Sequence, residues 1–394
     1  MAYKILIIIT QAFDRNAGGV QHTTYKMSRY FKQEGHQPHV FSYRMEGHSV
    51  QDVAELHSVD EEGGHKNNAN NLQLQKLIER IQPDVVINQM PYEREIGDAL
   101  SAMHTKQNFL LLGCLRNTLF TVKLNLPSYV KSVVPKYFQP IFNNYLGKQI
   151  LLMQHKKRHK NELKYILDTY DYYVMFGPPN IQELKYFVGD YKLGKTVLIP
   201  NSIPSVLDAI PVKEKRILWL SRLGYGQKRA DLILPFWKKV MNELPDWHFD
   251  IVGDGNAYDD LKKQIEQEKI PRVALYGKQV PDNYYKRSPI YIMTSENEGF
   301  PNTLIEAQSF GAIPVVYDNY PICSWVVKEG ESGVLITPFN VNQMAREVIN
   351  IAKDENIQKK LMEAALENAR EFEINKVGKK WVDFFDSQLK SRQQ

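Results

Sequence analysis

The chain has 394 residues, of which 43% are hydrophobic and 24% are charged, and its formal net charge is +5. This length exceeds what one hydrophobic core usually supports, so we expect a globular protein of two domains. No apolar run approaches the ~20 residues that a membrane-spanning helix needs, and nothing in the modest charge indicates a nucleic-acid partner.

Two cysteines, Cys114 and Cys323, lie far apart and match no metal-binding or redox spacing. We therefore expect free thiols in a reducing compartment and no structural disulfide. The N-terminal segment lacks an apolar run long enough for a signal peptide and continues as a buried strand. These features predict a cytoplasmic protein.

In the first half, short apolar strands alternate with helical patterns, which indicates a parallel sheet flanked by helices. A helix is predicted at residues 20–34 after the glycine pair Gly18-Gly19, and the polar interval 45–71 is predicted to be a long, partly ordered loop. The predicted strands are 5–9, 39–43, 84–88, 108–112 and 172–176.

The alternation starts again after Pro200, which predicts a second doubly wound sheet. Two such halves, joined near residues 200–212, would leave a cleft at the carboxyl ends of both sheets, where α/β proteins place ligands. The predicted strands of this half are 216–220, 248–252, 273–276, 290–294 and 313–317.

The segment 295–307, Ser-Glu-Asn-Glu-Gly-Phe-Pro-Asn-Thr-Leu-Ile-Glu-Ala, is the most informative part of the chain. It places two carboxylates, Glu298 and Glu306, around a glycine turn that follows a strand and opens a helix. Asn302 or Thr303 is expected to cap this helix, which would run to Phe310. Free amides and the positive end of the helix dipole can bind a diphosphate, and the carboxylates can accept hydrogen bonds from sugar and ribose hydroxyls. Alone, Thr303 and Glu306 would more readily be interpreted as a capping box, but this leaves Glu298 and the glycine turn unexplained.

This arrangement resembles the signature of retaining glycosyltransferases of the GT-B fold, most closely glycosyltransferase family 4. The resemblance extends over residues 199–340 through Ile199-Pro200-Asn201-Ser202-Ile203, Ser221-Arg222-Leu223 followed by Lys228, Ile251-Val252-Gly253-Asp254-Gly255, Gly311-Ala312-Ile313-Pro314-Val315-Val316 and Glu329-Gly330-Glu331-Ser332-Gly333, and more weakly to Gly18-Gly19-Val20. It implies an α/β protein with two Rossmann-like domains facing across a cleft. The expected parts are an N-terminal acceptor-binding domain at 1–203, a nucleotide-sugar-binding domain at 204–370, and a C-terminal segment at 371–394 whose helix crosses back to the N-terminal domain.

Breaking the bond between a sugar and a nucleoside diphosphate builds negative charge on the departing phosphate, which a catalyst must stabilise. No Asp-x-Asp pair suits a metal on the diphosphate, so Arg222 and Lys228 are predicted to replace it, although a pair of ordinary surface cations is the alternative. We therefore expect no metal and no cofactor beyond the nucleotide-sugar co-substrate. The catalytic residues expected are Glu298, Arg222 and Lys228. The donor-binding residues implied are Gly18, Gly19, Gly253, Lys278, Gly299, Phe300, Pro301, Asn302, Thr303, Leu304 and Glu306.

One departure concerns the N-terminal half, where relatives commonly carry a histidine at the end of a strand. The corresponding region here is 113–117, in which Arg116 or Asn117 would contact the sugar or acceptor instead. No carboxylate of this half is evidently placed as a nucleophile. The resemblance implies that the transfer retains the anomeric configuration of the sugar, because the acceptor attacks on the same face from which the phosphate leaves.

A cationic stretch leaves two interpretations open, because most such runs are the solvated face of a helix while others meet anionic lipid or a polyanionic acceptor. Upstream of it, apolar and aromatic residues at 129–145 alternate with Lys131 and Lys136, which fits an interfacial helical segment or core packing. The cationic residues are Lys148, His155, Lys156, Lys157, Arg158, His159, Lys160 and Lys164.

Together these patterns predict a metal-independent, retaining hexosyltransferase that moves a sugar from a nucleotide donor, UDP-sugar first and GDP-sugar second, to a glycan or lipid-linked acceptor in cell-surface polysaccharide biosynthesis. It would be cytoplasmic, with peripheral contact with an anionic membrane left open. The alternatives are a catalytically silent nucleotide-sugar-binding partner subunit and a GT-B epimerase.

Overall fold

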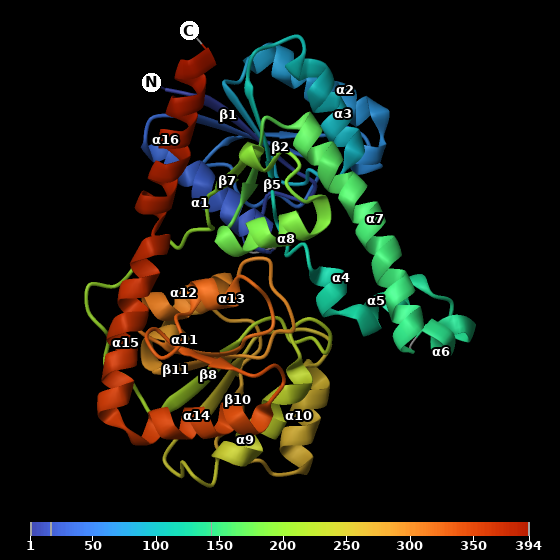
Figure 1. Cartoon of the computed structure of the whole chain (residues 1–394). Helices are drawn as coiled ribbons and strands as arrows, with labels where there is room; N and C mark the ends of the chain where they lie inside the picture. Colours follow the sequence, from blue (N-terminus) through green and yellow to red (C-terminus); the bar gives the residue numbers. More distant parts are fainter. Residues whose placement is uncertain (1, 16–17, 143, 393–394) are drawn as a thin grey trace. The chain divides into compact units, whose positions relative to one another are not determined.

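The computed structural model describes residues 2–15, 18–142 and 144–392 and divides into two compact units. Unit 1 contains residues 1–119, 152–204 and 374–394, and unit 2 contains residues 120–151 and 205–373. Each unit holds one parallel sheet with helices on both faces (Figure 1). This confirms the predicted α/β class with two Rossmann-like domains.

The sheet of unit 1 has seven strands in the order β3-β2-β1-β4-β5-β6-β7. Its strands are β1 Lys4–Ile9, β2 Gln37–Ser42, β3 Glu55–Ser58, β4 Val85–Asn88, β5 Leu110–Cys114, β6 Tyr172–Met175 and β7 Thr196–Leu198. Its helices are α1 Gly19–Gln33, α2 Asn68–Ile81, α3 Arg94–His104, α8 Pro178–Val188, α16 Ile374–Arg392 and most of α7 Tyr145–Thr169, with 3-10 turns η1 Gly64–Lys66 and η3 Leu193–Lys195.

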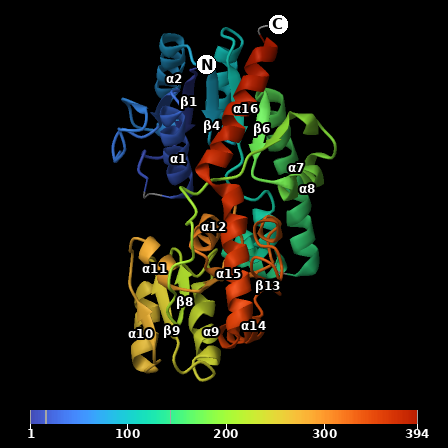
Figure 2. The ribbon, with the colours of Figure 1, turned by 90° about the vertical axis from the view of Figure 1, so that its left-hand side faces the viewer.

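Helices α1 and α16 cover one face of this sheet and contact each other (Figures 1 and 2). Strand β1 is apolar at every position from Ile5 onward because both of its faces are buried. Trp381 and Phe385 of α16 are buried in the core that covers one face. The helix predicted within the segment 371–394 is α16, and it is part of the packing of unit 1.

One part of the first half differs from the sequence prediction. The interval 45–71, predicted to be a loop, contains the edge strand β3, the turn η1 and the start of α2. This strand pairs with β2 in parallel register, and its polar residues suit an edge that is only half buried. The prediction was wrong here because short polar edge strands give almost no hydrophobic pattern.

The sheet of unit 2 has six strands in the order β10-β9-β8-β11-β12-β13. Its strands are β8 Arg216–Leu220, β9 His248–Val252, β10 Val273–Leu275, β11 Ile290–Met293, β12 Ile313–Tyr317 and β13 Val334–Ile336. Its remaining elements are α4 Thr121–Leu124, α5 Leu126–Val133, η2 Lys136–Phe138, α6 Gln139–Phe142, η4 Ala230–Leu232, α9 Ile233–Val240, α10 Tyr258–Gln267, α11 Asp282–Arg287, α12 Asn302–Ser309, α13 Cys323–Val326, α14 Val341–Lys353, α15 Glu355–Ala369 and η5 Arg370–Phe372.

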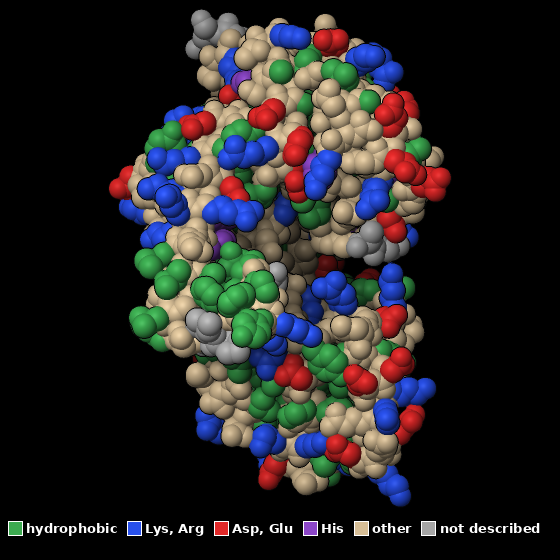
Figure 3. Space-filling view, turned by 90° about the vertical axis from the view of Figure 1, so that its right-hand side faces the viewer, with side chains coloured by type: hydrophobic (Ala, Val, Ile, Leu, Met, Phe, Trp, Pro, Cys, Tyr) green, Lys and Arg blue, Asp and Glu red, His purple; other side chains and the backbone are tan. Residues whose placement is uncertain are grey.

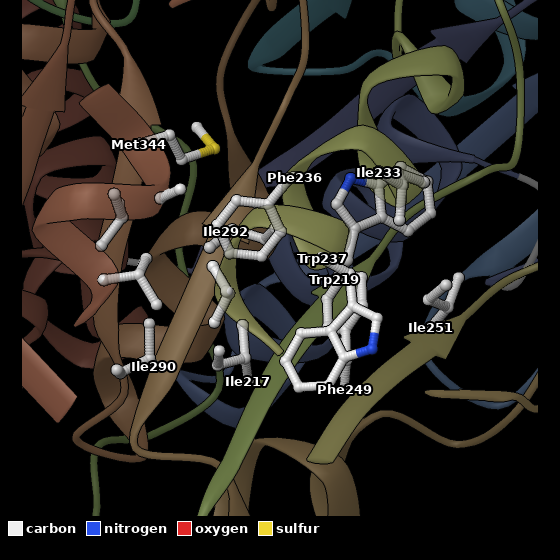
Figure 4. Packing of buried hydrophobic residues seen from close by; sticks show 14 of the residues in the cluster. Ile217, Trp219, Ile233, Phe236, Trp237, Phe249, Ile251, Ile290, Ile292 and Met344 are labelled. Carbon is white, nitrogen blue, oxygen red and sulfur yellow. The ribbon is translucent and has the colours of Figure 1, made fainter. Parts of the chain in front are cut away.

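The core of unit 2 lies between the sheet and helices α9, α10 and α14. Figure 4 shows Trp219 of β8, Trp237 of α9 and Phe249 of β9 grouped with aliphatic side chains of the neighbouring strands. Helices α12 and α15 pack against each other and against β11 and β12. Strand β8 is held on both sides by parallel neighbours, which fixes where its carboxyl end lies.

Residues 120–151 group with unit 2, although the sequence prediction placed them in an N-terminal domain ending at residue 203. A hydrogen bond ties this segment to the rest of unit 2, and a small core holds the segment itself together. The side-chain amide of Asn125 donates to Glu296 Oε2 at 2.9 Å, and Val130, Val134 and Leu151 form a small core of their own.

No helix in the described part of the chain is long and apolar enough to cross a membrane.

Candidate donor site in unit 2

The order of the strands in unit 2 identifies a place for a ligand. Chain connections run outward in opposite directions from β8, through β9 and β10 on one side and from β11 through β12 to β13 on the other. Strands β8 and β11 are therefore neighbours at the topological switch point of the sheet. Open parallel sheets bind ligands at the carboxyl ends of the strands at this point.

The loops that leave β8 and β11 meet in an ion pair. Lys228 Nζ donates to Glu298 Oε1 at 2.5 Å, and the two side chains are 18% and 10% exposed. The structure thus brings together a cation and a carboxylate that lie 70 residues apart in the sequence. Both groups form charge-assisted hydrogen bonds, the kind of bond that phosphates and sugar hydroxyls can also make.

Polar residues that the sequence analysis did not identify hold these two loops together. Trp219 Nε1 donates to Thr294 Oγ1 at 2.9 Å, and this hydroxyl donates to the carbonyl of Lys228 at 2.8 Å. The Gln227 side chain donates to the carbonyl of Asn297 at 2.8 Å. The sequence signal was weak, since each residue is an ordinary polar neighbour of a motif residue and its partner is distant in the chain.

Glycines let the loop after β9 approach the loop after β8. A Cβ atom built on Gly253 would lie 1.8 Å from the carbonyl oxygen of Ser221, and one on Gly255 would lie 2.2 Å from that of Leu223. Both glycines also have φ values that other residues rarely adopt, 143° and 152°. Gly253 is therefore required by the packing of the loops, whether or not it contacts a donor.

Helix α12 begins differently from the prediction. Its N-cap is Pro301, and no side chain caps it, so the expectation that Asn302 or Thr303 caps the helix was wrong. Thr303 Oγ1 instead accepts a hydrogen bond from the buried Tyr291 hydroxyl at 3.0 Å. The amides of Asn302 and Leu304 donate to the carbonyls of Phe300 and Pro301. Because these two amides already donate within a local turn, a diphosphate would have to break these hydrogen bonds or bind other amides.

The second glutamate of the motif lies on α12 itself. Glu306 is half-buried and accepts a long hydrogen bond, 3.4 Å, from the hydroxyl of Tyr285. Burial, and then the charge of Glu306, raise the pKa of Tyr285 well above its usual range. Tyr285 therefore stays protonated and remains a hydrogen-bond donor toward Glu306 at neutral pH. Gly299, Phe300, Pro301 and Leu304, the other predicted donor-binding residues of this segment, are buried around the turn.

Arg222 and Lys278, two further predicted site residues, are exposed. Neither forms an ion pair with any residue in the described part of unit 2. The structure therefore joins Lys228 to Glu298 but leaves Arg222 outside this pair.

The remaining predicted residues belong to unit 1. Gly18 is the N-cap of α1, and Gly19 is its first residue. Arg116 follows β5, donates to Asn201 Oδ1 at 3.2 Å and is half-buried, and burial lowers the pKa of its guanidinium. Asn117 is exposed, and its side chain accepts from the amide of Thr118.

Two groups of described residues have side chains close enough to share a metal ion, His39 with Glu55 and His57, and His65 with Glu93 and Glu95. Both lie in unit 1, and neither contains a predicted site residue. In the first group, ring nitrogens of His39 and His57 already lie within hydrogen-bonding distance of each other, at 3.2 Å. The sequence expectation of a site without metal remains a prediction.

Comparison with known proteins identifies the same region. Residues 208–371 match the model of the family described as Glycosyl transferases group 1. A poly(glycerol-phosphate) alpha-glucosyltransferase of Bacillus subtilis is 28% identical over 191 residues, which are 48% of this chain and 28% of that protein. The amylovoran biosynthesis glycosyltransferase AmsD of Erwinia amylovora is 27% identical over 190 residues, 47% of this chain and 52% of that protein. This chain thus spans about half the length, or less, of these relatives.

Similarity of structure extends over nearly the whole chain. A mutant of TarM of S. aureus, in complex with Fondaparinux, alpha-GlcNAc-glycerol and UDP, superposes with a TM-score of 0.70 at 13% identity, covering 97% of this chain and 99% of that one. Sucrose-phosphate synthase from Thermosynechococcus elongatus gives 0.74 at 14% identity, covering 99% and 100%. At such low identity these matches establish the fold. The chain therefore has the GT-B fold, and its residues 208–371 are similar to the glycosyl transferases group 1 family.

Proposed function

We propose that this protein is a retaining, metal-independent glycosyltransferase that transfers a hexose from a nucleotide sugar, UDP-sugar first and GDP-sugar second, to a glycan or lipid-linked acceptor. The observation that carries the proposal is the ion pair between Lys228 and Glu298 at the switch point of the sheet. It supplies one group suited to a phosphate and one suited to sugar hydroxyls at the place where such folds bind ligands.

In the proposed reaction the bond between the anomeric carbon and the phosphate oxygen breaks, and a bond to the acceptor oxygen forms on the same face of the sugar. The proton of the acceptor hydroxyl passes to the departing phosphate. Lys228, assisted by the exposed Arg222, stabilises the negative charge that develops on that phosphate. Glu298 accepts hydrogen bonds from sugar hydroxyls and orients the ring, while Glu306 does so for the ribose.

The donor choice is supported by a relative in structure whose complex contains UDP. The acceptor class is supported by relatives named for poly(glycerol-phosphate) glucosylation and amylovoran biosynthesis. We therefore propose a role in cell-surface polysaccharide biosynthesis, at a cytoplasmic location. Arg116 and Asn117 of unit 1 remain the proposed contacts for the sugar or acceptor.

The test is donor hydrolysis by the full-length chain without acceptor. UDP-glucose, UDP-galactose, UDP-N-acetylglucosamine and GDP-mannose are incubated separately, with and without EDTA, and release of nucleotide is measured. Slow release from one donor that persists in EDTA is expected. A thermal shift without release from any donor would indicate a silent binding subunit instead, and a change of sugar configuration on an intact nucleotide would indicate an epimerase. With an acceptor in hand, the anomeric configuration of the product, measured by NMR, decides retention.

A further inference from the structure

One segment of the chain has an unusual charge distribution. Between Asp98 and Glu162 there is no carboxylate side chain. Residues 120–161 contain eight basic residues, and because the whole chain carries only +5, the remaining residues together carry −3. The eight are Lys123, Lys131, Lys136, Lys148, Lys156, Lys157, Arg158 and Lys160. Positive charge is thus concentrated on the helical elements α4 to α7.

The same segment exposes large hydrophobic side chains. Among the described residues, seven of the sixteen exposed large hydrophobics lie between positions 133 and 153. Six of them belong to unit 2, and we call these six the apolar surface. They are Val133 (49% exposed), Tyr137 (86%), Phe138 (47%), Tyr145 (75%), Leu146 (72%) and Ile150 (45%). Figure 3 shows hydrophobic side chains gathered over these helices, with lysine and arginine side chains nearby.

Packing within the segment does not need these side chains. Val130, Val134 and Leu151 are buried against one another, with Tyr129 and Phe142 packed around them, and they form the inner core of the segment. The apolar surface points away from this core. On α7, Leu146 and Ile150 are four residues apart and share one face of the helix, and this stripe continues at Met153, which is 64% exposed. Contiguous exposed apolar side chains of this kind mark interaction sites.

Charge decides among the partners that such a surface could bind. Two copies of this chain meeting through it would bring Lys131, Lys136 and Lys148 of one copy toward the same lysines of the other, which disfavours self-association. An anionic bilayer offers both complements, since lysines near its surface contribute about 1 kcal/mol each and apolar side chains of interfacial helices are buried in the boundary between headgroups and acyl chains. Tyrosines such as Tyr137 and Tyr145 also suit the membrane interface.

We propose that the apolar surface, with the lysines around it, docks this protein on an anionic lipid bilayer. The stripe on α7 and the aromatic side chains of η2 enter the interface, while Lys131, Lys136 and Lys148 meet lipid phosphates. This inference rests on exposed side chains and charge, and it does not depend on the transferase activity.

Vesicle co-sedimentation of the full-length chain tests the proposal. Vesicles of phosphatidylcholine with 40% phosphatidylglycerol are compared with pure phosphatidylcholine. We expect at least tenfold tighter binding to the anionic vesicles, and loss of most of this difference in 0.5 M NaCl because salt screens the charges. Equal binding to both kinds of vesicle, or no binding to either, would overturn the proposal.

Two pairs of variants separate the apolar and basic contributions. Tyr145→Ser with Leu146→Ser, and Lys131→Gln with Lys136→Gln, should each weaken binding to anionic vesicles at least tenfold. Matched controls are Val212→Ser with Val280→Ser, whose side chains are 94% and 72% exposed, and Lys262→Gln with Lys263→Gln on the exposed side of α10. The controls should bind like the parent chain.

The variants must also keep their fold, which the UDP-induced thermal shift and the circular dichroism spectrum report. The apolar surface would be a protein interface if two results were obtained together. The parent chain would bind no vesicles but dimerise in sedimentation velocity, and the variant with Tyr145→Ser and Leu146→Ser would be monomeric. That outcome would refute the lipid assignment and leave the proposed transferase activity standing. Conversely, a chain that binds vesicles but hydrolyses no donor would refute the activity alone.

Discussion

Replacing Glu298 by glutamine should have opposite effects on nucleotide binding and on sugar transfer. In the structure Lys228 donates to the Glu298 carboxylate, so a phosphate must compete with this carboxylate for the ammonium group. Glutamine keeps an acceptor of the same shape but removes its charge, while the Lys228 ammonium group stays charged. Hydrogen bonds that involve a charged group contribute about 1.5–3 kcal/mol, and the bond from Lys228 should move toward the lower end of this range when its acceptor becomes neutral. The competition should therefore weaken by roughly 0.5–1.5 kcal/mol, which corresponds to about 2- to 10-fold tighter binding of free UDP.

Titration calorimetry with UDP at constant ionic strength measures this change, and donor hydrolysis measures turnover in the same samples. Turnover should fall at least a hundredfold in Glu298→Gln, because the sugar hydroxyls lose a charged hydrogen-bond acceptor. The phosphate keeps its proposed partner, Lys228. Lys228→Met should behave differently and bind UDP about 10- to 150-fold more weakly, because it loses a charge-assisted bond of about 1.5–3 kcal/mol.

Glu296→Gln is the matched control, since Glu296 lies on the same loop and accepts from Asn125 rather than from a lysine. Its UDP affinity should stay within about twofold of the parent chain, because Glu296 accepts from the neutral amide of Asn125 and its replacement leaves the pair between Lys228 and Glu298 in place. Unchanged or weaker UDP binding in Glu298→Gln would refute the idea that the carboxylate and the phosphate share Lys228. Full turnover in the same variant would remove Glu298 from the site.

Two further predictions concern the stability of unit 2. Burial lowers the pKa of Lys213 from 10.5 to about 7, so between these values the unfolded chain binds one proton more than the folded chain, and the free energy of unfolding should rise with pH by up to about 1.4 kcal/mol per unit. Urea unfolding at pH 7, 8 and 9 should therefore show the parent chain gaining stability relative to Lys213→Met as the pH rises. A difference between the two chains that does not change with pH would contradict the lowered pKa. Gly253→Ala should lower the free energy of unfolding by more than about 2 kcal/mol in the same assay, because the added Cβ would lie 1.8 Å from the carbonyl oxygen of Ser221. The control is Gly226→Ala, whose Cβ would meet no atom within 4 Å and which should change the free energy of unfolding by less than about 0.5 kcal/mol.

The strands that carry the site were predictable because they are buried on both faces. Continuous apolar runs such as Ile290–Met293 give a clear signal, and the predicted strands at 216–220, 248–252 and 313–317 have the bounds observed. The edge strands β7 and β13 were missed because each has only three residues, which is too short to give a clear pattern.

Contacts between distant residues were harder to predict than elements. The family resemblance suggested both Lys228 and Glu298, but only the strand order shows that their loops are neighbours and that the side chains pair. The cap of α12 was predicted wrongly because Thr303 has a competing partner, Tyr291, which a local pattern cannot reveal. Similarly, the tie between Asn125 and Glu296 places residues 120–151 in unit 2, although they follow strands of unit 1 in the sequence.

The pair between Lys228 and Glu298 gives a physical reason for this site to select a particular kind of ligand. Removing one partner of a largely buried pair leaves an uncompensated charge, which is unfavourable, so Lys228 should leave Glu298 only when another anion replaces it. A diphosphate is such an anion, and a sugar attached to it places hydroxyl donors where the carboxylate then needs partners. A phosphate without a sugar satisfies only Lys228, and a sugar without a phosphate satisfies only Glu298. On this reasoning the pair favours a ligand that carries both groups, as a nucleotide-sugar donor does.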